Sequence, residues 1–169
     1  MNTSRLSNLL GALALKISDA LEDTVKRNAY TATTMSALIS IDAHPGDTID
    51  TLSKVLRLSP SGMSRAIARL EQQGLVERHR GKDGRAVFLF STNRGRKEVQ
   101  KFLFHRHEII KPIVENLSET EQTTLLNALE KMLSTIPLDR EDARNICRFC
   151  DETICHTKGC PVDRDTKDF

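Results

Sequence analysis

Residues 59–74 read SPSGMSRAIARLEQQG, and the rest of the chain can be interpreted around this stretch. Ser59 is a favourable N-cap, because its hydroxyl can accept a hydrogen bond from a free amide of the first helical turn. Pro60 follows at the one helical position where a missing N–H costs nothing. Gly74 can end the helix in the left-handed conformation. The sequence therefore predicts a helix between Ser59 and Gly74.

The predicted helix has two faces of different chemistry. One face is an apolar stripe at helical spacing, formed by Met63, Ala66, Ile67 and Leu70. The other face carries Ser61, Ser64, Arg65, Ala68, Arg69 and Gln72. Small hydroxyls and arginines without an acid between them can lie close against a polyanion. An ordinary surface helix is the alternative, because basic helical faces are common.

A second, shorter helix is predicted just before the first. Apolar residues recur at helical spacing at Ile49, Leu52, Val55 and Leu56. This helix would begin near Asp47 or Thr48, and a tight turn then leads to Ser59. Two short helices joined in this way are typical of a helix-turn-helix unit.

The pattern after Gly74 changes to that of a β-hairpin. LVERHR (residues 75–80) and RAVFLF (residues 85–90) are predicted strands, and the GKDG between them contains a pair that closes hairpins. The loop and its flanks carry Arg78, His79, Arg80, Lys82 and Arg85. A basic hairpin directly after a helix-turn-helix is typical of a wing that reaches phosphates or the minor groove. A plain surface hairpin is the alternative.

Positive charge is concentrated in this part of the chain. Residues 54–101 contain twelve Lys or Arg and four acids, so they carry +8, whereas the whole chain carries +2 and the remainder −6. Such a block inside a periodic, folded segment is the electrostatic pattern expected for phosphate binding. The candidate DNA-binding residues are Ser61, Ser64, Arg65, Arg69, Arg80, Lys82 and Arg85.

Residues 49–89 resemble the winged helix-turn-helix of the MarR (multiple antibiotic resistance regulator) family. The resemblance lies in the pattern S-P-S-x-x-S-R-A-I-x-R-L-E-x-x-G-L-V-E-R and in the D-x-R of the hairpin, and the flanking helices extend it over roughly residues 6–136. It implies a homodimer that represses transcription by binding double-stranded DNA. It also implies relief of repression by a small effector, often an anionic aromatic, or by cysteine oxidation.

The same resemblance assigns roles to individual residues. It implies contacts to bases or nearby phosphates for Ser61, Ser64 and Arg65. Arg85 would hold the wing in the minor groove, and Asp83 would brace Arg85 rather than contact DNA. We expect a near-palindromic operator, because each protomer of a symmetric dimer reads one half-site.

Further helices are predicted on both sides of the basic segment. They cover residues 4–27, 33–41, 92–116 and 118–133, with Pro112 expected to kink or divide the third and Ser118 and Glu121 forming a capping box at the fourth. Their apolar faces exceed what one small winged domain can cover, so we expect dimerisation through them. The predicted fold is mainly α with a small β-hairpin wing, in which the N- and C-terminal helices form the dimerisation domain. His105 and His107 are interpreted as surface or interface residues, since positions two apart do not share a helix face.

All four cysteines lie in the tail, in CRFCDETICHTKGC. Cys147, Cys150, Cys155 and Cys160 have the spacing C-x2-C-x4-C-x4-C, which matches the retroviral zinc knuckle in spacing only. Four thiolates so close together can bind one tetrahedral zinc ion. An iron–sulfur cluster, disulfide redox sensing and free thiols are the alternatives. We expect a domain of residues 1–137, with its DNA-binding core at about 47–91, and a metal-binding tail of residues 138–169.

Other function classes have less support in the sequence. The LLGALAL of residues 9–15 is followed at once by charged residues, and no apolar run approaches membrane-spanning length, so a cytoplasmic protein without a membrane partner is expected. A thiol or iron–sulfur enzyme is the alternative of a different class. No nucleophile beside a base and no phosphate loop supports it, so the chain is predicted not to be an enzyme. A regulator whose tail senses metal or oxidant is the third hypothesis.

Overall fold

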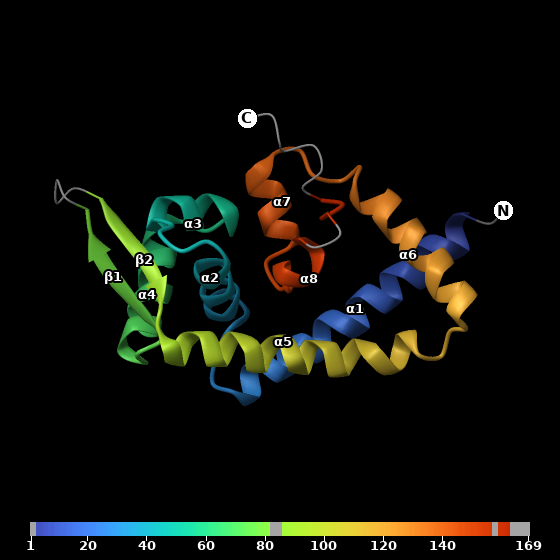
Figure 1. Cartoon of the computed structure of the whole chain (residues 1–169), viewed down its shortest axis with the longest axis horizontal. Coiled ribbons are helices and arrows are strands. Elements are labelled where there is room, and N and C mark those ends of the chain that lie inside the picture. Colours follow the sequence, from blue (N-terminus) through green and yellow to red (C-terminus); the bar gives the residue numbers. More distant parts are fainter. Residues whose placement is uncertain (1–2, 82–85, 157–158, 163–169) are drawn as a thin grey trace.

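The computed structural model describes residues 3–81, 86–156 and 159–162. In these residues the fold is mainly helical with one antiparallel two-stranded hairpin, as the sequence predicts (Figure 1). The elements in chain order are α1 (Thr3–Arg27), α2 (Ala32–Ala43), α3 (Ile49–Val55), α4 (Pro60–Gln72), β1 (Val76–Arg80), β2 (Val87–Ser91), α5 (Asn93–Val114), α6 (Glu119–Leu133), α7 (Arg140–Ile146) and α8 (Glu152–His156).

The helix-turn-helix is formed by α3 and α4, and its caps are those that the sequence predicts. Thr48 accepts a hydrogen bond from the Thr51 amide at the start of α3, and Ser59 Oγ accepts one from the Gly62 amide at 3.1 Å at the start of α4. Gly74 follows α4 with a φ of +69°, the left-handed conformation that ends the helix. The turn between the helices contains Arg57, whose φ is +54°.

The core of the winged domain surrounds α2. Residues 34–41 are all buried, including Thr34, Ser36 and Ser40, so this helix is enclosed on every side. Leu38 and Ile41 of α2 pack in one cluster with the predicted apolar stripe of α4 and with Leu89 of β2. This packing fixes α4 by its apolar face and leaves the opposite face exposed to solvent.

The hairpin pairs Val76 with Ser91 and Arg80 with Val87. Its two strands extend away from the helices (Figure 1). Its base is anchored to the loop before α3, because the Gly46 amide donates to the Leu89 carbonyl at 2.9 Å. The tip, including the predicted Lys82, Asp83 and Arg85, lies outside the described residues.

The helix α5 begins tightly against the start of the hairpin. The Thr92 amide donates to the Leu75 carbonyl oxygen at 3.0 Å, and Gly95 packs on the same peptide. An added Cβ on Gly95 would lie 2.1 Å from that oxygen, a separation that no side chain can adopt. A glycine is therefore required where α5 crosses the chain entering β1.

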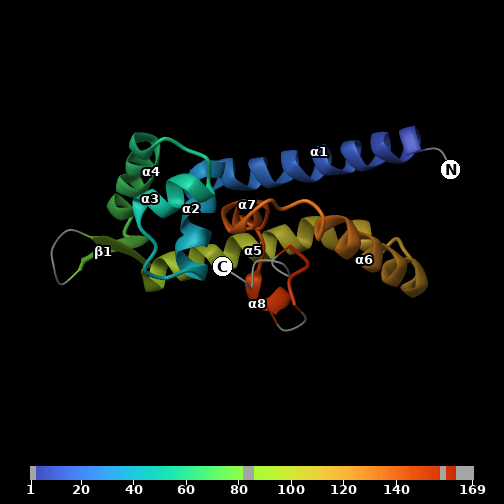
Figure 2. The same cartoon turned by 90° about the horizontal axis from the view of Figure 1, so that it is seen from above.

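The helices α1, α5 and α6 form an arm that extends away from the winged domain (Figures 1 and 2). The expected division of α5 at Pro112 is wrong, because α5 continues to Val114 and the proline lies in its last turn. There the missing N–H removes only one of the final helical hydrogen bonds. The predicted capping box of Ser118 and Glu121 is confirmed at the start of α6.

The arm exposes many large apolar side chains. Among the described residues, α6 has no buried side chain, and the exposed apolar residues of α1 and α6 are Leu6, Leu9, Leu10, Leu13, Leu15, Leu125, Leu126, Leu129 and Met132. None of the described helices is long and apolar enough to cross a membrane. An exposed apolar surface of this extent is typical of a protein–protein interface.

The tail folds back onto the winged domain. In Figure 1, α7 lies between α3 and α6, and α7 packs directly against α3. Ala143 and Val162 are buried at 4% exposure each, so the tail has a small apolar contact of its own.

Candidate functional site

The first candidate site is the outward face of α4. Ser61 and Arg65 are exposed and Ser64 is half-buried, while Met63, Ile67 and Leu70 on the other face are completely buried. Ser61 Oγ lies 3.3 Å from the N-cap Ser59 Oγ, so two hydroxyls gather at the start of the helix. The predicted polar residues therefore share one accessible face.

Arg69 lies on the same helix but is engaged within the fold. Its Nη2 donates to the Ala29 carbonyl at 3.2 Å, which ties the end of α4 to the loop between α1 and α2. Nearby, Arg78 Nη2 of β1 lies 2.8 Å from Glu71 Oε2 of α4. The ion pair neutralises the acid that follows the basic face and joins the hairpin to α4.

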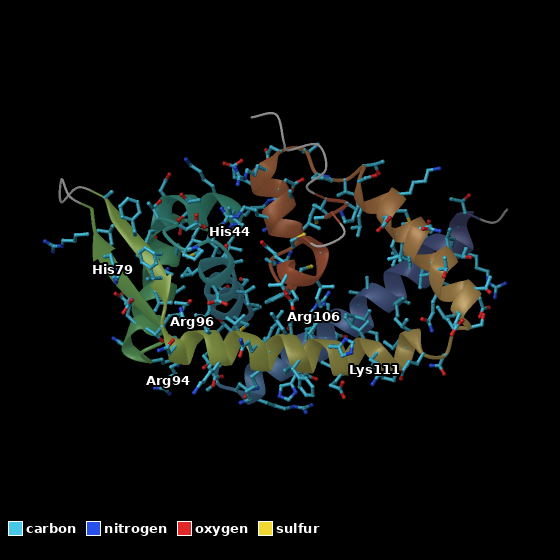
Figure 3. The ribbon with its side chains drawn as sticks, viewed as in Figure 1. His44, His79, Arg94, Arg96, Arg106 and Lys111 are labelled. Carbon is cyan, nitrogen blue, oxygen red and sulfur yellow. The ribbon has the colours of Figure 1, made fainter. Side chains whose placement is uncertain are left out.

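The wing adds further basic residues beside α4. Arg80 is exposed at the end of β1, and His79 packs its ring against Phe90 with centroids 4.7 Å apart. Arg94 and Arg96 lie at the start of α5, below the hairpin in Figure 3, and the Arg96 Nη1 donates to the Ser91 carbonyl at 3.0 Å. The described part of the wing thus extends the positive surface beyond α4.

The second candidate site is the group of cysteines in the tail. Cys147, Cys150, Cys155 and Cys160 line one cavity of about 250 Å³, together with residues of α2 and α7. The four are free thiols. Within the part of the chain that the structure describes, no three His, Cys, Asp or Glu side chains are arranged closely enough to hold a metal ion.

Two of these thiols form an asymmetric pair. A hydrogen bond to Cys150 raises the pKa of Cys147, and burial acts in the same direction. The same bond lowers the pKa of Cys150 to about 7, against the effect of burial and with help from the positive charge of Arg106. Arg106 lies on α5 opposite the tail (Figure 3). Cys150 is therefore the more readily ionised sulfur of the CxxC pair.

A groove of about 570 Å³ lies between α1, α2, the turn after α3 and the segment after α7. Its lining is largely apolar and includes Ile17, Leu21, Val25, Leu56 and Phe149. Among the described lining residues, two are arginines, Arg57 and Arg148, and one is acidic, Glu22. The groove is therefore mainly apolar, and its charged lining residues carry one net positive charge.

The contacts between the tail and the winged domain were not predicted from the sequence. Arg144 of α7 forms an ion pair with Asp47, and Asn145 donates to the Val55 carbonyl at 2.8 Å. The segment around Arg144 reads REDARNI, an ordinary charged helix, and the only clear sequence signal in it is the capping by Asp139.

Comparison with known proteins agrees with this geometry. Residues 30–86 match the MarR family. An uncharacterized HTH-type transcriptional regulator of Bacillus subtilis, YwhA, is 32% identical over 90 residues, which cover 53% of this chain and 65% of that protein. The HTH-type transcriptional repressor MdtR of the same organism is 24% identical over 133 residues, covering 78% of this chain and 86% of the repressor.

Solved structures show the same fold. The crystal structure of Streptococcus pneumoniae FabT in complex with DNA superposes with a TM-score of 0.66 at 20% identity, covering 77% of this chain and 94% of that one. The matched family and the similar proteins are transcription regulators rather than enzymes.

Proposed function

We propose that this chain, which carries a MarR-family winged helix-turn-helix domain, is a homodimeric transcriptional repressor that binds a near-palindromic operator. The observation that carries the proposal is the exposed polar face of α4, held outward by an apolar face that is fully buried. The repressor MdtR and the DNA-bound FabT support it by similarity. A protein with this function acts in the cytoplasm, where chromosomal DNA is accessible.

Ser61, Ser64 and Arg65 read base edges and nearby phosphates in the major groove. An arginine can contact guanine with two hydrogen bonds, whereas the short hydroxyls allow the backbone of α4 to approach the DNA closely. Arg69 and Arg80 contact the phosphate backbone, and the tip residues Lys82 and Arg85 follow the minor groove. The predicted DNA-binding core, residues 47–91, provides all of these groups.

Two protomers associate through the exposed apolar faces of α1 and α6. These faces cannot be covered within one chain, because α6 has no buried side chain among the described residues. A two-fold dimer places two α4 helices in successive major grooves, with half-sites about 34 Å apart. An anionic aromatic effector fits the groove beside Arg57 and Arg148, where it can alter the position of α4.

The tail of residues 138–169 binds one zinc ion through Cys147, Cys150, Cys155 and Cys160. Support comes from the one cavity that all four line. The sulfurs would have to move closer together to form a tetrahedral site. An iron–sulfur cluster is the second candidate for the same ligands, and redox chemistry of the Cys147–Cys150 pair is the third.

Purified protein is expected to contain about one zinc ion per chain, and replacing any one of the four cysteines by Ser should weaken its retention, because a ligand and a negative charge are lost. Metal analysis of the wild type and the four variants tests this. A brown protein with visible absorption would indicate an iron–sulfur cluster. Absence of metal under reducing conditions would contradict the metal site and favour thiol redox chemistry.

The roles within the DNA interface can be separated with two variants. Arg65→Ala should weaken binding to the operator by about 1–3 kcal/mol more than binding to random duplex, because only the operator offers its base contact. Arg85→Ala should weaken binding to both duplexes alike if it contacts mainly the phosphate backbone, which is common to both. Titration of each variant at fixed salt measures the difference, and equal losses for both variants on both duplexes would refute the assigned roles.

A further inference from the structure

The short helix α7 contacts both ends of α3, the first helix of the helix-turn-helix. At the start of α3, Arg144 forms an ion pair with Asp47, and its Nη2 also donates to Ser40 Oγ of α2 at 3.0 Å. At the end of α3, Asn145 Nδ2 donates to the Val55 carbonyl at 2.8 Å. This carbonyl belongs to the last turn, where helical partners are missing. Therefore α7 holds α3 along its length.

A further contact of α7 involves the turn between α3 and α4. Asp142 of α7 forms an ion pair with Arg57, the residue that adopts a positive φ in that turn. A non-glycine residue in this conformation carries strain and depends on its surroundings to stay there. The tail thus contributes to the geometry that sets α4 relative to α3.

The Arg144–Asp47 pair is also connected to the wing through the backbone of Asp47. The side chains of Arg144 and Asp47 are 15% and 14% exposed, so the pair is largely shielded from solvent. The backbone of Asp47 accepts a hydrogen bond from the Leu89 amide of β2 at 3.0 Å. One partly buried ion pair therefore joins the tail to a residue that is bonded to the wing and precedes α3.

The cysteines lie beside the same helix. Ala143 and Arg144 of α7 line the cavity that the four cysteines share. Phe149, which lies between Cys147 and Cys150 in the sequence, packs on Phe102 of α5 with ring centroids 5.3 Å apart. His44, which follows α2, lines the same cavity, and its Nε2 lies 3.3 Å from Glu152 Oε1. We call residues 140–162 the cysteine module, and its described part is attached to α2, α3 and α5.

This module is too small to be stable on its own contacts. Its helices α7 and α8 have seven and five residues, lengths at which an isolated helix does not persist in water. Binding of a metal ion by cysteines supplies folding free energy to such small segments. Occupancy of the cysteine site then decides whether α7 keeps the geometry that holds α3.

We propose that a thiophilic divalent cation at the four cysteines controls DNA affinity by fixing α7 against α3. This inference rests on the proposed function and adds its regulation. With the cation bound, α7 holds Asp47, the end of α3 and the following turn, so α4 and the wing are aligned for the operator. When the cation leaves, α7 loosens and the alignment is lost.

The test compares full-length protein loaded with Zn²⁺ and the same protein after chelation. Removal of zinc should increase amide hydrogen exchange in α3, lower operator affinity by about tenfold, and be reversed by added Zn²⁺. Hydrogen exchange reports the state of α3 without any DNA, so the two readouts are independent.

The variant Arg144→Met separates zinc binding by the cysteines from the effect of zinc on operator affinity. This variant should retain one zinc per chain, bind the operator about as weakly as the chelated wild type, and lose its response to zinc. Arg27→Met is the matched control, because it removes the same charge from an exposed position at the end of α1, outside the cavity that the cysteines line, and it should respond to zinc like the wild type. If Arg144→Met does not fold, Asn145→Ala can take its place. This variant removes only the bond to the Val55 carbonyl and should respond to zinc less strongly than the wild type.

The outcomes are distinguishable. Chelated wild type that keeps both its operator affinity and its protection of α3 would overturn the control by the cation and leave DNA binding intact. Protein that fails to take up Zn²⁺ would overturn it as well. If α3 responds to zinc but no duplex is bound specifically, the proposed repressor function fails, and control of DNA affinity fails with it.

Discussion

The double variant Leu9→Glu, Leu126→Glu is expected to be monomeric and to bind the operator at least about 100-fold more weakly than the wild type. The two leucines are 59% and 54% exposed on α1 and α6 of the single chain, so the charges cost little in a monomer. In the proposed dimer they would be buried without partners, which is strongly unfavourable. A monomer contacts one half-site and loses the contribution of the other.

Sedimentation and operator titration measure this effect, and circular dichroism checks that the helices remain. Leu138→Glu is a suitable control, because Leu138 is 90% exposed in the segment between α6 and α7. It adds one charge without touching the faces of the arm and should leave both dimer and affinity unchanged. A double variant that stays dimeric would show that the interface lies elsewhere.

Gly95→Ala is expected to lower the free energy of unfolding by about 3 kcal/mol, because the new methyl group overlaps a backbone atom. Its Cβ would lie 2.1 Å from the Leu75 carbonyl oxygen and 3.3 Å from Leu38 Cδ1. The peptide cannot simply move aside, since the same oxygen accepts the Thr92 amide and Leu75 is completely buried. α5 would have to separate from the hairpin.

Denaturant unfolding of both proteins gives the difference directly. Gly11→Ala is the matched control, because it makes the same change in α1, where nothing lies within 4 Å of the added Cβ. That variant should be stabilised by up to about 1 kcal/mol through helix propensity. Equal stability of Gly95→Ala and the wild type would contradict the close crossing of α5 over Leu75.

The helix α4 and the hairpin could be predicted because their signals in the sequence are local. Ser59, Pro60 and Gly74 fix the ends of α4 by cap chemistry, and the apolar stripe at helical spacing fixes which face is buried. The same holds for the hairpin, which two short strand-like runs and the Asp-Gly pair between them predict. Each signal depends on neighbours in the sequence, so no knowledge of distant contacts is needed.

The attachment of the tail could not be predicted, because it depends on residues far apart in sequence. Arg144 and Asp47 are separated by 97 positions, and nothing around either residue distinguishes it from a solvated surface charge. The contact of Arg69 could not be predicted for the same reason, since its bond to the Ala29 carbonyl spans 40 positions. The spacing of the cysteines predicts one shared site for the four thiols, but it does not predict that α7 lines the cavity they share.

Some predictions concern residues beyond the described ranges. Lys82, Asp83 and Arg85 lie outside the described residues, and the roles expected of them in the wing stay predictions. Their effect on DNA binding rests on the Arg85→Ala titration. The charges that the structure does describe, from Arg65 on α4 to Arg80 on β1, remain on the exposed surface of the winged domain.

Footprinting of the protein on the DNA upstream of its own gene is the most direct test of specific DNA binding by a dimer. We expect one protected near-palindromic site, occupied by two chains and bound at least about 1000-fold more tightly than random duplex at physiological salt. Equal affinity for random duplex, or protection by a single chain, would contradict it.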